Sequence, residues 1–476
     1  MFGWVSLVFG LWAIITTWWI WYAAPIGAIA APIIQIVLFG GTFMIYHYVS
    51  KRARPALANM TLITGFIAAE FLYLTGQISF PWIILGNGFA NDVWAVQWYE
   101  FTGVFGGSLW VLASNLIIYK VIKTPSSKWL SYCAACVLAP VILSLIMYWS
   151  YRDHSDGEVI VTVVQPNIEP YTEKFVVPQP IQDTLMLTLS AEAPAGVDYI
   201  VLPETAIDDM IWEDRMLSSA SVRRYVEFVH TAYPETQLIT GATTHRRYFY
   251  EEDKTETART MGNLWYDAYN SAIAIDSTFN ISVHHKKKLV IGAETMPYMN
   301  ILKPLKSLIV DLGGTTGQLG SDTLTIVFAH PMANGAVAYS AAPICYESVY
   351  GEHFSSFVER GAQLMFIITN DGWWHDTPGY RQHFSFARLR AIENRRYIAR
   401  SANTGISGFI DARGNVLGTL GWNIRGTITD NVPLLDKVTF YSKYGDYIGR
   451  ACSYVFILCL LYYIAYRFRK RSHLVE

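Results

Sequence analysis

The sequence predicts an α/β catalytic domain inserted between transmembrane α-helices, and three observations point to this class. Of 476 residues, 52% are hydrophobic and 16% are charged, which is too apolar for an ordinary soluble protein and too polar for membrane helices alone. Long uncharged runs occur toward both ends of the chain. Between them, short β-rich runs alternate with helical stretches. The formal net charge of −2 gives no electrostatic case for binding nucleic acid.

Six apolar runs are long enough to cross the roughly 30 Å hydrocarbon layer of a membrane. They occupy residues 5–22, 27–49, 58–75, 101–122, 129–149 and 448–466. The first run is too long and too rich in tryptophan for a signal peptide, and no basic segment precedes it. We therefore expect three parts: an N-terminal transmembrane domain of about five spans, a catalytic domain, and a C-terminal transmembrane helix with a basic tail, at residues 1–150, 157–440 and 448–466.

Basic residues in the loops predict the orientation of these spans. Lysines and arginines follow the second and sixth spans and separate the fourth from the fifth, whereas the loops at 23–26 and 76–100 contain none. The positive-inside rule then places both ends of the chain in the cytoplasm. Residues 150–447 are predicted to lie on the opposite side of the membrane.

Two features of the membrane region are candidates for more than scaffolding. Glu70 lies inside the third span, where it marks either a functional site or a carboxylate hydrogen-bonded to a neighbouring helix. The aromatic loop at 80–99 is expected to lie at the membrane interface as an aromatic belt, close to an active site that faces lipid. Cys133 and Cys136 form a C-A-A-C motif, but their uncharged flanks favour small membrane-helix residues over a redox or metal pair. Five cysteines, four of them in apolar runs, predict no disulfide framework.

From Glu158 to about Asp436 the pattern of the sequence is typical of an α/β domain with a largely buried sheet. The helical stretches are at 211–232 and 380–396. The β-rich runs are at 159–167, 198–204, 236–243, 270–276, 336–345, 363–371 and 397–404.

Three of the predicted strand ends carry side chains that together fit one chemistry. They are Glu204 in VLPETA, Lys286 in HHKKKLVIGAE and Cys345 in APICYE. A cysteine nucleophile needs a base for its proton, and a cation or donor set for the oxyanion that forms when it attacks an acyl carbon. Glutamate, lysine and cysteine supply these roles. The apolar residues before Glu204 predict a poorly solvated carboxylate, the setting in which such a group acts as a base near neutral pH.

Cys345 is the predicted nucleophile because of its position in the chain. Residues 337–344 are typical of a strand and residues 346–348 of the first turn of a helix, so the cysteine lies at a corner. There the unpaired N–H groups of the helix are expected to favour the thiolate over the thiol. The alternative is a buried structural cysteine. The glutamate and lysine motifs elsewhere in the chain favour the nucleophile.

In order and spacing these motifs resemble the nitrilase superfamily of carbon–nitrogen hydrolases. The matching stretches are LPETA, KKKLVIGAE, ICYES and the run from NDGWWHDTPGYRQHF to RSANTG. The membrane spans, VVQPNIEPYTEKF, YNSAIAID and TFYSKYGDYIGR narrow the resemblance to the membrane-embedded branch, the apolipoprotein N-acyltransferases. The resemblance covers the chain from about Gly10 to Arg450. It implies a nitrilase-like α-β-β-α sandwich on the periplasmic face of the bacterial cytoplasmic (inner) membrane.

The same resemblance implies roles for individual residues. Glu204 would be the general base, Lys286 the cation that stabilises the oxyanion, and Cys345 the nucleophile. Other matching positions would support the active site or face substrate and lipid, respectively Glu294, Tyr346 and Glu347, and Phe175, Trp373 and Trp374. The implied substrates are a phospholipid acyl donor and the α-amino group of the S-diacylglyceryl cysteine of an apolipoprotein. We expect a monomer that uses no cofactor and no metal.

The chain departs from the family pattern at three points. Phe175 replaces a tryptophan, which keeps an aromatic surface and loses the indole N–H. The family's Pro-Phe-Gly-Glu is Ile-Gly-Ala-Glu at 291–294, which leaves the carboxylate in place and changes the loop before it. The family also has about two further spans before the position where this chain begins. These departures affect the fit of the substrate rather than the class of reaction.

Two other functions compete with acyl transfer. A membrane-tethered amidase that hydrolyses a small amide would use the same three residues. The apolar segment at 298–312, with Trp373 and Trp374, instead favours a lid that touches lipid. A catalytically silent scaffold for lipoprotein sorting is the second rival, and the intact glutamate, lysine and cysteine set argues against it.

Overall fold

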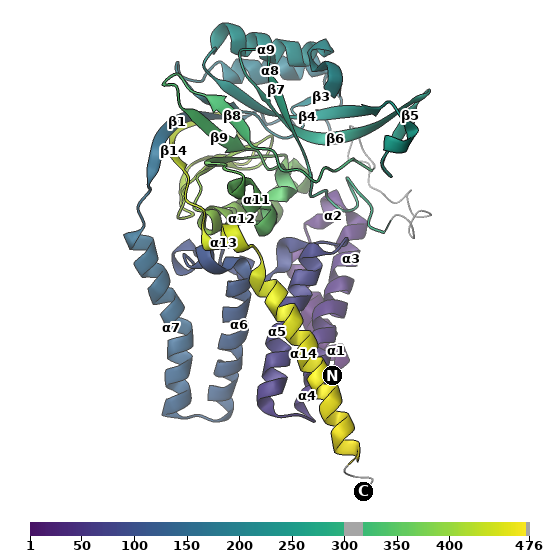
Figure 1. Ribbon diagram of the computed structural model, residues 1–476, viewed down its shortest axis with the longest axis vertical. Helices are drawn as coiled ribbons and strands as arrows, with labels where there is room; N and C mark the ends of the chain where they lie inside the picture. Colours follow the sequence, from purple (N-terminus) through teal and green to yellow (C-terminus); the bar gives the residue numbers. More distant parts are fainter. Residues whose placement is uncertain (299–317, 473–476) are drawn as a thin grey trace. The chain divides into compact units, whose positions relative to one another are not determined.

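The computed structural model describes residues 1–298 and 318–472, and within them the chain divides into two compact units (Figure 1). The helical unit comprises Met1–Trp21, Pro25–Ser150 and Tyr444–Glu476, and the α/β unit comprises Tyr22–Ala24 and Tyr151–Lys443. The segment expected to act as a lid, at 298–312, lies outside the described residues except for Tyr298.

The helical unit contains five stretches that are long and apolar enough to cross a membrane: Pro25–Ser50, Pro55–Thr75, Tyr99–Lys123, Ser127–Ser150 and Tyr447–Arg469. The predicted span at 5–22 is interrupted, because one helix ends at Thr17 and the next begins at Ile20. The helices of this region are α1 (Phe2–Thr17), α2 (Ile20–Ala23), α3 (Pro25–Gln35), the π-helical η1 (Ile36–Gly40), α4 (Gly41–Ser50), α5 (Pro55–Thr75), α6 (Tyr99–Lys123), α7 (Ser127–Ser150) and α14 (Tyr447–Ser472).

The aromatic loop at 80–99 folds into three 3-10 helices, η2 (Pro81–Ile83), η3 (Leu85–Phe89) and η4 (Val93–Ala95). Trp82, Trp98 and Tyr99 are buried, whereas Trp94 is 46% exposed, and the position of this loop at a membrane interface stays a prediction. Trp82 stacks on Phe80, and Trp98 meets Tyr99 and Trp110 edge-on.

Glu70 anchors this loop. The buried Glu70 side chain accepts a hydrogen bond from the Leu85 N–H, 2.7 Å from Oε1. A backbone N–H that is removed from water needs such a partner. Glu70 is therefore hydrogen-bonded, with this loop rather than a neighbouring helix as its partner.

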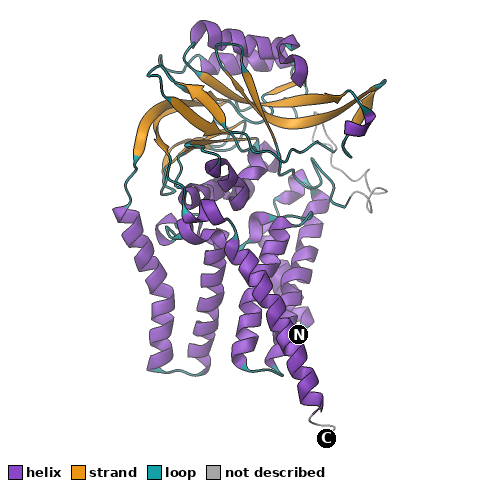
Figure 2. Cartoon of the chain, in the orientation of Figure 1, coloured by secondary structure: helices purple, strands orange, loops and turns teal. Residues whose placement is uncertain are grey.

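The α/β unit contains two mixed β-sheets (Figure 2). The first has the order β14-β1-β2-β4-β6-β5, with β3 paired to β4 and β7 paired to β6; the second has the order β13-β12-β11-β10-β9-β8. The strands of the first sheet are β1 (Ser155–Gln165), β2 (Tyr199–Val201), β3 (Ile207–Trp212), β4 (Gln237–Tyr248), β5 (Arg259–Met261), β6 (Leu264–Ile275), β7 (Ile281–His285) and β14 (Gly426–Leu435). Those of the second are β8 (Phe328–Pro331), β9 (Val337–Ala341), β10 (Leu364–Thr369), β11 (Ile398–Ala402), β12 (Ser407–Ile410) and β13 (Val416–Leu420).

Three hydrophobic clusters show how the layers are stacked. One joins residues of both sheets, such as Val161 and Phe366, and therefore lies between them. The second joins the first sheet to α8 (Gln179–Ser190) and α9 (Ala220–Ala232), and the third joins the second sheet to α11 (Gly351–Glu359) and α12 (Pro378–Asn394). This is an α-β-β-α sandwich, which confirms the predicted fold class. The remaining helices are short: η5 (Glu213–Ser218), η6 (Glu251–Asp253), η8 (Cys345–Val349), η9 (Asp371–Trp374) and α13 (Phe440–Tyr444).

Every predicted β-rich run contains a strand, and α12 confirms the helix predicted at 380–396. The helix predicted at 211–232 is wrong in its first part. There the chain forms the end of β3, which pairs with β4, and then η5. The α-helix α9 begins only after Ser219, whose side chain caps it by accepting a hydrogen bond from the Val222 N–H.

Candidate active site

Glu204 lies just beyond the carboxyl end of β2, which is hydrogen-bonded between β1 and β4. The next residue, Thr205, adopts a φ of +47°, so the chain turns sharply here. The neighbouring strand comes very close, because a Cβ built on Gly241 of β4 would lie 2.4 Å from the Thr205 nitrogen and 2.6 Å from the Glu204 Cα. Only glycine allows this approach, and the backbone of β4 thereby supports the Glu204 turn.

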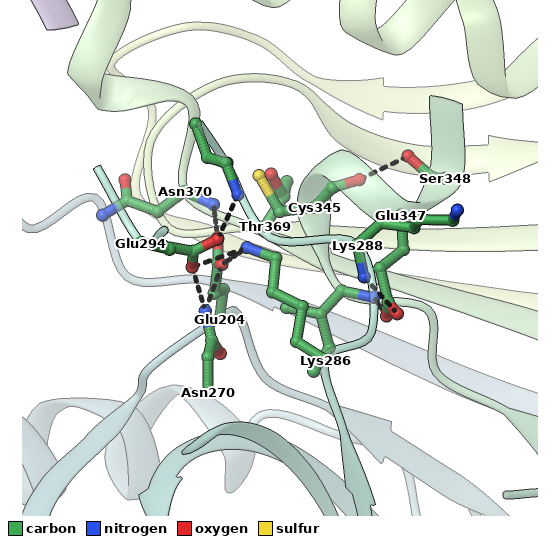
Figure 3. Close-up of polar contacts among 12 residues, drawn as sticks. Glu204, Asn270, Lys286, Lys288, Glu294, Cys345, Glu347, Ser348, Thr369 and Asn370 are labelled. Carbon is green, nitrogen blue, oxygen red and sulfur yellow. Dashed lines mark hydrogen bonds and ion pairs between the residues drawn. The ribbon is translucent and has the colours of Figure 1, made fainter. Parts of the chain in front are cut away.

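Lys286 follows β7 directly, and its backbone N–H still bonds to the Asn270 carbonyl of β6, at 2.8 Å. This register puts its ammonium next to two carboxylates: Nζ lies 2.9 Å from Glu204 Oε1 and 2.9 Å from Glu294 Oε1 (Figure 3). Burial opposes the charge of Lys286, but the two carboxylates outweigh it and hold its pKa well above the usual value. The lysine is therefore a fixed cation.

Asn270 binds both carboxylates from another side. Its Nδ2 donates to Glu204 Oε1 at 2.8 Å and to Glu294 Oε1 at 2.9 Å. The Asn370 backbone N–H donates to the other Glu204 oxygen, Oε2, at 3.0 Å. With Lys286, these donors hold the Glu204 carboxylate in one orientation at the sheet ends.

Cys345 begins η8, after β9 and a single bridge between Ile344 and Ile368. The predicted strand-to-helix corner is present, with a 3-10 helix as its first turn. The cysteine has a φ of +49°, a strained value for a residue with a side chain. Figure 3 shows Cys345 in the same group of side chains as Glu204 and Lys286. All three predicted residues are thus brought together, each less than a tenth exposed.

The protonation state predicted for the cysteine is wrong for this structure. Burial, and next the negative charge of Glu204, raise the pKa of the Cys345 thiol, although Lys286 acts in the opposite direction. The five-residue η8 supplies too little positive potential to reverse this. The resting Cys345 side chain is therefore a thiol, and an attack by its sulfur would require an acceptor for the proton.

Glu347 links the loop that follows Lys286 to the turn at Cys345. Its Oε1 accepts hydrogen bonds from the Lys287 N–H at 2.7 Å and from His353 Nε2 at 2.8 Å. Its Oε2 accepts from the Ile344 N–H at 2.9 Å and lies 3.3 Å from His284 Nε2. Although burial opposes its charge, the two histidines hold the pKa of Glu347 well below the usual value. This predicted supporting residue thus positions two neighbours of the site through their backbone.

Tyr346 lies beside Cys345 in the sequence, is buried, and meets the Tyr350 ring edge-on with centroids 5.2 Å apart. It packs within the corner.

The three residues expected to face substrate or lipid separate into two groups. Phe175 is 36% exposed and stacks on the half-buried Trp373, with ring centroids 6.2 Å apart. Tyr171 joins these two residues, because its hydroxyl donates to the Trp373 carbonyl at 2.7 Å. Trp374 instead packs edge-on against His383. The first pair offers an apolar surface beside η9, while Trp374 covers a buried histidine.

Sequence reasoning missed several residues of this site. Asn270 and Asn370 hold the Glu204 carboxylate, Thr369 lowers the pKa of the Cys345 thiol, and Asp371 raises it. Asn270 lies in YNSAIAID, Asn370 and Asp371 begin the run NDGWW, and Thr369 directly precedes that run, so proximity to motifs of the family resemblance was the available signal. Strand register determines which atom of each residue faces Glu204 or Cys345.

Taken together, the geometry supplies the parts for acyl chemistry through a cysteine. A thiol lies in a poorly solvated place beside one carboxylate that is held by three donors, one of which is the Lys286 ammonium. Among the described residues no group of three or more histidine, cysteine, aspartate or glutamate side chains could hold a metal ion. The described side chains suffice for a proton acceptor and a cation near the sulfur.

Comparisons with known proteins identify the family of the chain. A family model described as carbon-nitrogen hydrolase matches residues 160–437. A protein of Chlorobaculum tepidum named apolipoprotein N-acyltransferase is 30% identical over 465 residues, covering 94% of this chain and 85% of that protein. A Treponema denticola protein named apolipoprotein N-acyltransferase 1 is 24% identical, covering 96% and 86%. The crystal structure of Saccharomyces cerevisiae Nit3, of the nitrilase superfamily, aligns with a TM-score of 0.41 at 14% identity, covering 60% of this chain and 93% of Nit3.

The family model spans more than half of the chain, and the Chlorobaculum relative is matched over most of its length. The matched region contains Glu204, Lys286 and Cys345. The chain therefore belongs to the apolipoprotein N-acyltransferase family, within the carbon–nitrogen hydrolases.

Proposed function

We propose that this protein is an N-acyltransferase that matures lipoproteins. It moves a fatty acyl chain from a phospholipid, through a thioester on Cys345, to the α-amino group of the S-diacylglyceryl cysteine of an apolipoprotein. The observation that carries the proposal is the buried Glu204–Lys286 contact at 2.9 Å beside the Cys345 thiol, in a chain whose relatives bear that enzyme name.

In the first half of the reaction, the Cys345 sulfur attacks the ester carbonyl carbon of the phospholipid. Glu204 accepts the thiol proton, which the raised pKa of the thiol makes necessary. Lys286 faces the negative charge that develops on the carbonyl oxygen. When the C–O bond breaks, Glu204 returns the proton to the leaving oxygen, giving a lysophospholipid and the acyl thioester.

In the second half, the amine attacks the thioester carbonyl and gives its proton to Glu204. The C–S bond then breaks, the electron pair stays on the sulfur, and the thiolate takes the proton back. Lys286 again stabilises the oxyanion. One chain supplies every group named in these steps, so a monomer suffices.

A membrane setting with the catalytic region on the periplasmic side fits these substrates. Apolar helices precede and follow the α/β unit in the chain, and the loop charges favour both ends of the chain in the cytoplasm. A reporter that works only in the cytoplasm should be active when fused after Glu476 and silent when fused near Asp156. The reverse pattern would place the α/β unit in the cytoplasm and remove the lipoprotein substrate.

The fate of the thioester tests transfer against hydrolysis. We expect mass spectrometry of the protein with phospholipid alone to show a persistent acyl adduct, because Glu204, Lys286 and Cys345 are all buried and water reaches them poorly. Adding a diacylglyceryl-cysteine peptide with a free α-amine should clear the adduct and give the N-acylated peptide. The matched control is the same peptide with an acetylated amine, which should leave the adduct in place.

Hydrolysis would look different in the same experiment. Rapid release of free fatty acid without any acceptor would make water the natural second substrate. The membrane-tethered amidase or hydrolase would then replace our proposal. Absence of any adduct on the intact protein would favour the silent scaffold.

A further inference from the structure

Thr369, the last residue of β10, lies between the nucleophile and a buried aspartate. The parallel bridge between Ile344 and Ile368 places Thr369 next to Cys345, where its hydroxyl lowers the pKa of the thiol, and its Oγ1 lies 2.9 Å from Asp371 Oδ1. The Thr369 and Asp371 side chains are completely buried. Figure 3 shows Thr369 beside Cys345, in the same group of side chains as Glu204 and Lys286.

A hydroxyl carries one proton and two lone pairs, so it cannot donate to both neighbours at once. While the sulfur is a thiol, its S–H can donate to Thr369 Oγ1, and the Thr369 proton points to Asp371. Once the sulfur is a thiolate, it offers only lone pairs to Thr369. The hydroxyl proton then has two competing acceptors, the sulfur and the Asp371 carboxylate.

Asp371 has other hydrogen-bond donors that remain when Thr369 no longer donates to it. Its Oδ2 accepts from the Arg400 guanidinium at 2.7 Å, and its Oδ1 lies 2.9 Å from His383 Nδ1. Both partners are completely buried, so these bonds do not compete with solvent. The carboxylate therefore keeps two strong donors when the Thr369 proton turns away.

The same partners stop Asp371 from acting as a rival base. Burial alone would favour its neutral form, but Arg400 and His383 outweigh burial and hold the pKa of Asp371 below its usual value. The thiol proton consequently goes to Glu204, and Asp371 stays negatively charged throughout. That charge disfavours a nearby thiolate, which makes a compensating donor at the sulfur more valuable.

We propose that Thr369 is a catalytic residue. Its hydroxyl donates a hydrogen bond to Asp371 while Cys345 is a thiol or thioester, and it donates to the sulfur instead whenever the thiolate forms. Its part in acyl transfer rests on the function proposed above. During amide formation the C–S bond breaks and the electron pair remains on sulfur. The Thr369 hydroxyl stabilises that pair until Glu204 returns the proton taken from the amine.

Alkylation of Cys345 by iodoacetamide tests this directly, because the thiolate is the reacting species and no acyl substrate is needed. The full chain in detergent is treated at one pH, and peptide mass spectrometry follows Cys345 separately from the other four cysteines. Thr369→Val keeps the shape and removes the donor. We expect its alkylation rate to fall about tenfold or more, the scale of losing one hydrogen bond to a charged group.

Two further variants separate this role from a packing defect. Thr369→Ser retains the hydroxyl and should alkylate at close to the wild-type rate. Ser348→Ala removes another buried hydroxyl of the same corner, one that donates to the Cys345 carbonyl at 2.7 Å rather than to the sulfur, and it should also remain close to wild type. A Thr369→Val rate within twofold of wild type, or an equal loss in Ser348→Ala, overturns the proposal.

The proposed acyl transfer can fail without affecting this result. If the wild-type protein forms no acyl adduct but Thr369→Val still slows alkylation, the Thr369 assignment stands and the transferase function falls. If the adduct forms and clears normally in Thr369→Val, and alkylation is also unchanged, the transferase function stands and the Thr369 assignment falls.

Discussion

Cys345→Ala is expected to abolish the acyl adduct that the wild-type protein forms with phospholipid. Alanine carries no nucleophilic atom at position 345, and a thioester cannot form without the sulfur. The side chain is small and lies at a turn, so the α/β unit should remain folded when a single atom is removed. The measurement is intact-protein mass spectrometry after incubation with phospholipid, with thermal unfolding as a check on the fold.

Cys133→Ala is the matched control for this experiment. Cys133 lies in α7, within the helical unit, whereas Cys345 belongs to the α/β unit. Its substitution should leave the adduct at the wild-type level. An undiminished adduct in Cys345→Ala would refute the assignment of the nucleophile and move attention to another residue.

Lys286→Met should slow formation of the adduct by at least two orders of magnitude. Methionine keeps much of the chain length but carries no charge, so the oxyanion loses its cation at a cost on the order of 3 kcal/mol. The substitution also leaves the Glu204 and Glu294 carboxylates close together with only Asn270 as a shared donor. The rate of adduct formation is measured over time by the same mass spectrometry, and thermal unfolding reports any loss of stability separately.

Lys287→Met supplies the comparison for this variant. Lys287 Nζ bonds to the Thr323 carbonyl at 3.0 Å in an exposed position, and the Lys287 backbone N–H, which binds Glu347, is unchanged by the substitution. We expect a rate close to wild type. Equal losses at both positions would mean that a diffuse basic patch, rather than one placed ammonium, supports the reaction.

Much of this fold was predictable because its elements have distinct local patterns. The buried strands are short apolar runs, and each of the seven predicted ones contains a strand. The predicted helix at 211–232 included the end of β3 and the 3-10 helix η5, because a polar sequence such as 213–219 is typical of a helix. The α-helix begins only after Ser219, which caps it. Spacing of apolar residues does not reveal where a cap interrupts a pattern.

The site was predictable in its main side chains and not in its electrostatics. Glu204, Lys286 and Cys345 each stand in a short motif, which is information carried by neighbours in the sequence. The donors that hold Glu204 come from β6 and from the end of β10, and strand pairing alone brings them there. The cysteine was expected to favour the thiolate, because a sequence shows a helix start but neither burial nor the approach of Glu204.

The long sequence separations across this site impose an order on its assembly during synthesis. Along the sequence, Glu204 is 82 residues away from Lys286 and 166 residues away from Asn370. The Glu204 carboxylate accepts a hydrogen bond from the backbone N–H of Asn370. A ribosome that makes the chain from its N-terminus therefore produces Glu204 long before either partner exists. Cys345 follows 141 residues after Glu204 (345 − 204), and the Asn370 donor that completes the hydrogen bonds of Glu204 follows only after β10. Cys345 and Glu204 thus come together late, when most of the sandwich that shields them has already been synthesised.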